Sequence, residues 1–155
     1  MTHTRAWKNF KRMEDSVCLF AGLVYLAAVL HAWRVLPGAI GLKATVTLAA
    51  PAAFLALSTL LPLFVQPLRR PMRRYVWTSF QAGFGQTPLS VLMGLALPAI
   101  LAALIFLQIR GATHGGRYPA GIFSAYAAGI GILLAQALLV RELERDPEHR
   151  AAIEE

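Results

Sequence analysis

The sequence has no acidic residue between Asp15 and Glu142, and this absence is its most informative feature. Only 15% of the 155 residues are charged, whereas a soluble domain carries about a quarter. Proton and cation transporters commonly place carboxylates in their membrane spans, so the gap argues against a proton-coupled antiporter. No carboxylate pair and no cysteine–histidine couple falls within the apolar runs either, and we therefore expect no enzyme activity.

Cysteine and histidine are also scarce. The single cysteine, Cys18, excludes an intrachain disulfide and lies near one end of an apolar run, where we expect a buried reduced thiol. His31 is the only histidine inside such a run. A neutral imidazole can ligate the metal of haem or chlorophyll, which makes His31 a weak candidate ligand. We predict no metal site and no cofactor, apart from bound phospholipid.

Long apolar runs fill the interval that lacks acids, at residues 16–33, 44–65, 89–109 and 118–140. A helix needs about 20 apolar residues to cross the hydrocarbon core of a bilayer. The sequence therefore predicts an all-α polytopic membrane protein with four transmembrane helices in one bundle over residues 16–140. Short connections after the first and third runs predict two antiparallel helical hairpins.

The two ends of the chain are polar. Within residues 1–15, Trp7, Phe10 and Met13 recur at helical spacing among basic residues, which predicts an amphipathic helix at the membrane interface. Residues 141–155 mix both charge signs and predict a solvated tail, in which Pro147 interrupts or restarts a helix.

Basic residues predict the orientation of the spans. The net charge is +7, and most Lys and Arg precede residue 16, follow residue 140 or lie in the connection 66–88. By the positive-inside rule, both termini and this arginine-rich loop face the cytoplasm. Topology explains the charge, so we expect no nucleic-acid partner. The excess of arginine over lysine and the abundant alanine indicate a bacterial inner membrane.

Two sets of residues are candidates for binding. Small side chains let helices approach closely in lipid, within this bundle or against another subunit, and the last run carries such a set: Gly121, Ala125, Ala127, Ala128, Gly129 and Gly131. Guanidinium groups and an aromatic ring in the loop 66–88 predict contacts with anionic lipid head groups: Arg69, Arg70, Arg73, Arg74 and Trp77.

These features leave several functions open. Our leading hypothesis is a non-catalytic accessory or structural subunit of a larger respiratory, photosynthetic or transport complex, which contacts other integral membrane subunits through its small-residue faces. The alternative is a small homo-oligomeric transporter or lipid-handling protein. A third hypothesis is a haem- or pigment-binding subunit that uses His31.

Overall fold

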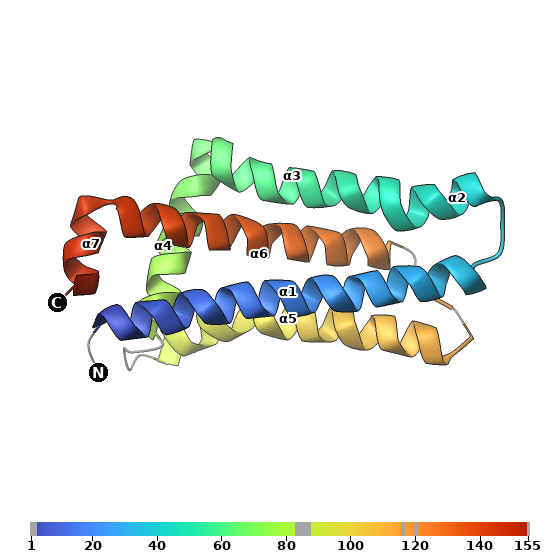
Figure 1. Ribbon diagram of the computed structural model, residues 1–155, viewed down its shortest axis with the longest axis horizontal. Helices are drawn as coiled ribbons and strands as arrows, with labels where there is room; N and C mark the ends of the chain where they lie inside the picture. Colours follow the sequence, from blue (N-terminus) through green and yellow to red (C-terminus); the bar gives the residue numbers. More distant parts are fainter. Residues whose placement is uncertain (1–2, 83–87, 116, 120, 155) are drawn as a thin grey trace.

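The computed structural model describes residues 3–82, 88–115, 117–119 and 121–154 of the chain, and every regular element among them is helical. The elements are α1 (His3–Val35), α2 (Ile40–Ala44), the π-helix η1 (Thr45–Ala49), α3 (Ala50–Phe64), α4 (Gln66–Ala82), α5 (Pro88–Thr113), α6 (Ile122–Arg145) and α7 (Pro147–Glu154). Figure 1 shows α1, α3, α5 and α6 lying lengthwise beside one another, with α4 across one end.

Three segments among the described residues are long and apolar enough to cross a membrane: Trp7–Val35, Ile40–Phe64 and Ile122–Arg145. The second runs through α2, η1 and α3 as one continuous rod (Figure 1). These three segments contain or overlap the runs expected at residues 16–33, 44–65 and 118–140. The all-helical, membrane-compatible fold predicted from the sequence is therefore confirmed.

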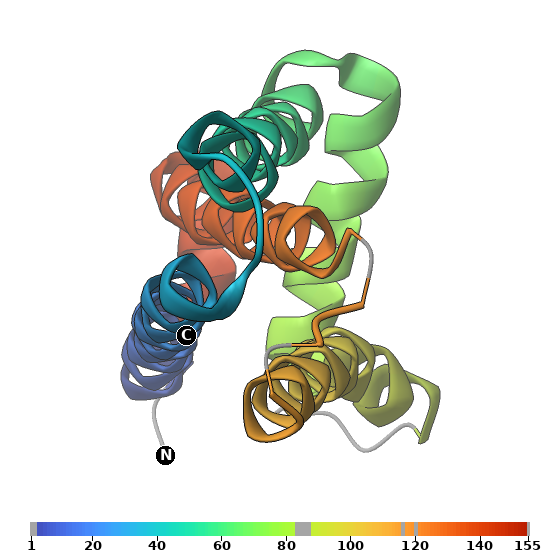
Figure 2. The same ribbon diagram turned by 90° about the vertical axis from the view of Figure 1, so that its right-hand side faces the viewer.

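Helix α6 is the centre of the bundle. It contacts α1, α3, α4, α5 and α7, and 61% of its apolar stretch is buried within the chain, against 22% for α1 and 17% for the second segment. Figure 2 shows α6 between α3 and α1 in the end-on view. Small and aliphatic residues cover several faces of α6, and this lets neighbouring helices pack on more than one side.

This central position changes the arrangement expected for the first two spans. Instead of packing along their whole lengths as a hairpin, α1 and α3 are separated by α6 (Figures 1 and 2). Helix α1 meets the second segment at η1, where the Tyr25 hydroxyl donates a hydrogen bond of 2.8 Å to the Thr47 carbonyl. Pro51 has no N–H to offer that carbonyl four residues earlier, so Tyr25 supplies the missing donor.

Helix α4 occupies most of the connection at residues 66–88, which the sequence predicts as a loop. Val76 and Phe80 are buried and Met72 packs beside them, while Arg70 and Arg74 are exposed. Apolar residues four apart form one face of a helix and arginines form the other, which is the physical reason for helix formation here. Residues 83–87 of the expected loop lie outside the described part of the chain.

The N-terminal segment is not a separate element, because α1 runs without interruption from His3 to Val35. The side chain of Trp7 is only 1% exposed and packs with Val76, Phe80, Leu139 and Leu143 of α4 and α6. The expected position of residues 1–15 at the membrane interface stays a prediction. What the structure adds is that Trp7 joins this segment to the rest of the chain.

Candidate functional site

Charged side chains from α1, α4 and α6 meet at the end of the bundle that holds α7. Lys11 Nζ lies 2.8 Å from Glu144 Oε2, and Arg69 Nη2 lies 2.6 Å from Glu142 Oε1. Arg73 forms an ion pair with Asp146. The side chains of each pair are partly exposed, so each pair adds little to stability by itself. Together they fasten α1 and α4 to the end of α6.

Asp146 joins three elements at this end. Its side-chain carboxylate accepts a hydrogen bond of 3.3 Å from the Glu148 amide at the start of α7, next to Pro147 at the first helical position. Desolvation raises the pKa of Asp146. The Glu148 amide and the Arg73 guanidinium lower it by more, so the pKa lies below the ordinary value of an aspartate. The interruption expected at Pro147 is confirmed, since α6 ends at Arg145 and α7 begins at Pro147.

The predicted head-group residues divide into two sets. Arg69 and Arg73 point to the carboxylates of the α6 end, and the Trp77 ring meets the His149 ring edge-on with centroids 4.7 Å apart. Arg70 and Arg74 are exposed on the opposite face of α4 and have no ion-pair partner among the described residues. Contact with lipid head groups stays a prediction, and Arg70 and Arg74 are the members free to make it.

The small residues of α6 also divide. Ala127, Gly129 and Gly131 are buried within the chain, whereas Gly121 and Ala125 are exposed and Ala128 is half-buried. Gly131 lies directly against α3, because a Cβ atom there would come within 2.6 Å of the Leu55 carbonyl oxygen. At the same crossing, the Thr59 hydroxyl donates to the Leu55 carbonyl of its own helix at 2.7 Å, and its oxygen lies 3.2 Å from the Gly131 carbonyl oxygen. Packing inside the bundle therefore occupies Gly131, and Gly121 and Ala125 remain on the surface.

His31 contacts a tyrosine at the opposite end of the bundle from α7. Its Nδ1 atom lies 2.6 Å from the Tyr118 hydroxyl, and the Tyr118 ring covers Gly111, where an added Cβ atom would approach within 2.7 Å. The contact links α1 to the connection between α5 and α6. His114 hydrogen-bonds locally, with Nδ1 2.9 Å from the Arg110 carbonyl. Among the described residues, no group of three His, Cys, Asp or Glu side chains could hold a metal ion.

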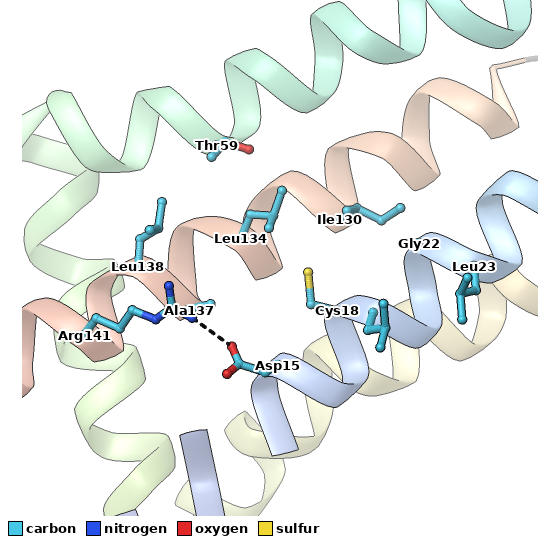
Figure 3. A pocket seen from close by; sticks show the side chains of 11 residues that line it. Asp15, Cys18, Gly22, Leu23, Thr59, Ile130, Leu134, Ala137, Leu138 and Arg141 are labelled. Atoms are coloured by element: carbon cyan, nitrogen blue, oxygen red, sulfur yellow. Dashed lines mark ion pairs between the residues drawn. The ribbon is translucent and has the colours of Figure 1, made fainter. Parts of the chain in front are cut away.

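An apolar groove of about 570 Å³ runs along the outside of α1 and α6 and reaches α3. Figure 3 shows the side chains of Cys18 and Leu23 on α1, Ile130, Leu134 and Leu138 on α6, and Thr59 on α3. An ion pair marks the end nearest the termini, where Arg141 Nη2 lies 3.6 Å from Asp15 Oδ1. Cys18, expected to be buried, is half-buried in this wall.

Sequence reasoning missed this groove. Its wall combines residues from three helices, and no spacing along the chain brings Thr59 next to Leu134. The sequence does mark the charged end of the groove. Asp15 is the last carboxylate before the long acid-free interval, and it directly precedes an apolar run. No protein-family model, curated protein or solved structure matches this chain.

Proposed function

We propose that the chain is a non-catalytic accessory or structural subunit of a larger assembly in a bacterial inner membrane. The observation that carries this proposal is that two tyrosine hydroxyls inside the bundle join one helix to another. The Tyr126 hydroxyl donates to the Ala21 carbonyl at 3.1 Å, and the Tyr25 hydroxyl donates to the Thr47 carbonyl at 2.8 Å. Each bond joins two helices, so these groups support architecture rather than line an open path.

The proposed topology has four spans and places both termini in the cytoplasm. Helix α5 is added here to the three membrane-length segments described above. Helix α5 has 26 residues, which exceeds the length of about 20 needed to cross the hydrocarbon core. The first turns of α1 and all of α7 lie at the same end of the bundle (Figure 1). Arg69, Arg73 and Arg141 lie at that end too, in accord with the positive-inside rule.

The contact with another subunit is proposed to use the exposed small residues of α6. Ala125 is exposed and starts the face that continues to the half-buried Ala128. The side chain of Ala125 is small enough for a partner helix to approach closely, and the position is not consumed by packing within the chain.

Purification in a gentle detergent, followed by mass spectrometry of the eluate, tests this role. We expect membrane proteins in fixed stoichiometry with the wild-type chain and their loss from Ala125→Leu. Gly41→Leu is the matched control, because no atom lies within 4 Å of an added Cβ atom at Gly41. A wild-type chain that elutes without any partner, or an Ala125→Leu chain that keeps every partner, contradicts the proposal.

A second candidate is a small homo-oligomeric transporter or lipid-handling protein, and the apolar groove is the observation that favours it. In this case the exposed Arg70 and Arg74 of α4 gather anionic head groups. The eluate would then contain only this chain as an oligomer. Lipid movement in reconstituted vesicles would fall when Arg70 and Arg74 are replaced by Gln.

A further inference from the structure

The groove beside Cys18 covers about half of a bilayer. On α1 it extends from Asp15 to Leu23, which is about 12 Å of helix, and on α6 from Ile130 to Arg141, about 16 Å. The hydrocarbon core is about 30 Å thick. A partner helix that crosses the membrane would need a contact surface along the whole thickness of the hydrocarbon core. An acyl chain lies within a single leaflet and needs only half of that length.

The two ends of the groove differ in chemistry. Its body is lined by aliphatic side chains and by Gly22, where an added Cβ atom has no neighbour within 4 Å and would project into open space. The end of the groove nearest the chain termini holds Asp15 and Arg141, whose side chains are 48% and 54% exposed. We call the end with Asp15 and Arg141 the charged mouth. An apolar wall that leads to a charged mouth matches a phospholipid, in which an acyl chain leads to a phosphate.

Arg141 at the charged mouth is only loosely paired. The 3.6 Å separation of Arg141 and Asp15 is longer than a hydrogen bond, so the guanidinium keeps donors for another acceptor. Arg145 follows one turn later on α6 and Arg12 precedes Asp15 on the same face of α1. Both are exposed and have no ion-pair partner among the described residues. Neither of them lines the groove, so Arg141 is the guanidinium at its mouth.

We propose that the groove holds one acyl chain of an anionic phospholipid from the leaflet on the side of both termini, with its phosphate at Arg141. Arginine pairs well with phosphate through two parallel N–H bonds. Asp15 competes with the phosphate for the same guanidinium. The inference requires that the bundle spans a membrane and does not depend on the accessory-subunit role.

Cys18 reports on the occupant, because it lines the groove and is the only thiol in the chain. The probe is the full chain in detergent, with phosphatidylglycerol or phosphatidylcholine added at equal concentration. We expect phosphatidylglycerol to slow alkylation of Cys18 by N-ethylmaleimide, and phosphatidylcholine to slow it less. Equal rates with and without lipid overturn the site, and equal protection by the two lipids overturns the head-group assignment.

Variants test the two ends of the groove separately, with bound phosphatidylglycerol counted by native mass spectrometry. Gly22→Leu fills the groove and should release the lipid, whereas Gly41→Leu, also in open space, should retain it. Arg141→Gln should weaken binding roughly fivefold, and Asp15→Asn should strengthen it. The exposed Arg34, at the other end of α1, gives the control Arg34→Gln.

Two results would overturn the proposal. In the first, Gly22→Leu and Arg141→Gln retain as much phosphatidylglycerol as the wild-type chain. In the second, light scattering shows that Gly22→Leu turns a dimer into a monomer without loss of lipid, which would assign the groove to a second copy of the chain. Alkylation of Cys18 in the wild-type chain decides the question even where a variant fails to fold.

Discussion

Gly131 lies where α6 packs directly against the backbone of α3, and its missing side chain is what permits this contact. A Cβ atom at this position would come within 1.9 Å of Ser58 Oγ and 2.6 Å of the Leu55 carbonyl oxygen. The Ser58 hydroxyl can rotate away, but the Leu55 carbonyl belongs to the α3 backbone and moves only with the helix. Gly131 is therefore a position that only glycine suits.

We predict that Gly131→Ala destabilises the bundle by about 1–3 kcal/mol, the usual cost of overpacking a close contact. The measurement is the unfolding midpoint in detergent by circular dichroism. Gly22→Ala is the control, since Gly22 has open space around its Cα atom. Matching midpoints for the two variants would show that α3 and α6 are not in this contact.

Single residues show how far the sequence predicts the packing. The sequence indicates the small residues of α6 as candidates for close contact and leaves two packing roles open to them. The position of α3 decides that Gly131 packs inward, while Ala125 stays on the surface. The partner of Tyr25 was also unpredictable, because it depends on which α1 turn faces the carbonyl that Pro51 leaves free.

At the scale of elements, α4 depends on ion pairs that cross to another helix. Arg73 pairs with Asp146, and Arg69 pairs with Glu142. The pKa of Asp146 lies below 3.8 in the folded chain. A carboxyl whose pKa is lowered by folding stabilises the folded state above its unfolded pKa and loses this effect as the pH falls through its folded pKa.

We predict that Arg73→Gln lowers the unfolding midpoint at pH 7 and flattens its dependence on pH in the acid range. The wild-type chain should lose stability as the pH falls below 3.8, the ordinary pKa of aspartate, because the protonated carboxyl no longer pairs with Arg73. Thermal unfolding over a series of acid buffers measures both effects. Arg74→Gln, on the exposed face of α4, should leave the profile unchanged; parallel profiles for Arg73→Gln and the wild type would contradict the prediction.

Helix α4 was predictable in principle. Met72, Val76 and Phe80 follow one another at intervals of four, which indicates an amphipathic helix. Arginines fill positions between them, so the same segment also fits the positive-inside pattern of a cytoplasmic loop. The crossing of α4 over the end of the bundle was not predictable, since it depends on contacts with Leu139 and Leu143 of α6, far along the chain.

For the molecule as a whole, the number of spans follows from the side on which the ends of α5 lie. Gln81 precedes α5 and Thr113 ends it, and both are exposed. We predict that a membrane-impermeant maleimide labels Thr113→Cys in intact spheroplasts and labels Gln81→Cys only after permeabilisation. Both variants carry Cys18→Ser to remove the native thiol.

The Cys18→Ser chain without an introduced cysteine measures the background labelling in this experiment. Labelling of both introduced cysteines from one side would mean that α5 does not cross the membrane, which would leave three spans. Labelling of Gln81→Cys from outside and Thr113→Cys from inside would invert the proposed orientation.

The sequence by itself determined that the chain is helical and apolar enough for a membrane. Runs of about 20 apolar residues have one stable solution in lipid, because only a helix satisfies its own backbone there. The acid-free interval also confines the carboxylates to the two ends of the chain, so every ion pair must draw its carboxylate from one of those ends.

Only the tertiary structure decided which helix is central and what the helices enclose. The three segments long enough to cross a membrane are all apolar, so hydrophobicity does not distinguish their neighbours in lipid, and close packing decides which helices meet. Contacts such as Thr59 with Gly131 place α6 between α3 and α1. That placement creates the groove beside Cys18, whose wall no single stretch of sequence contains.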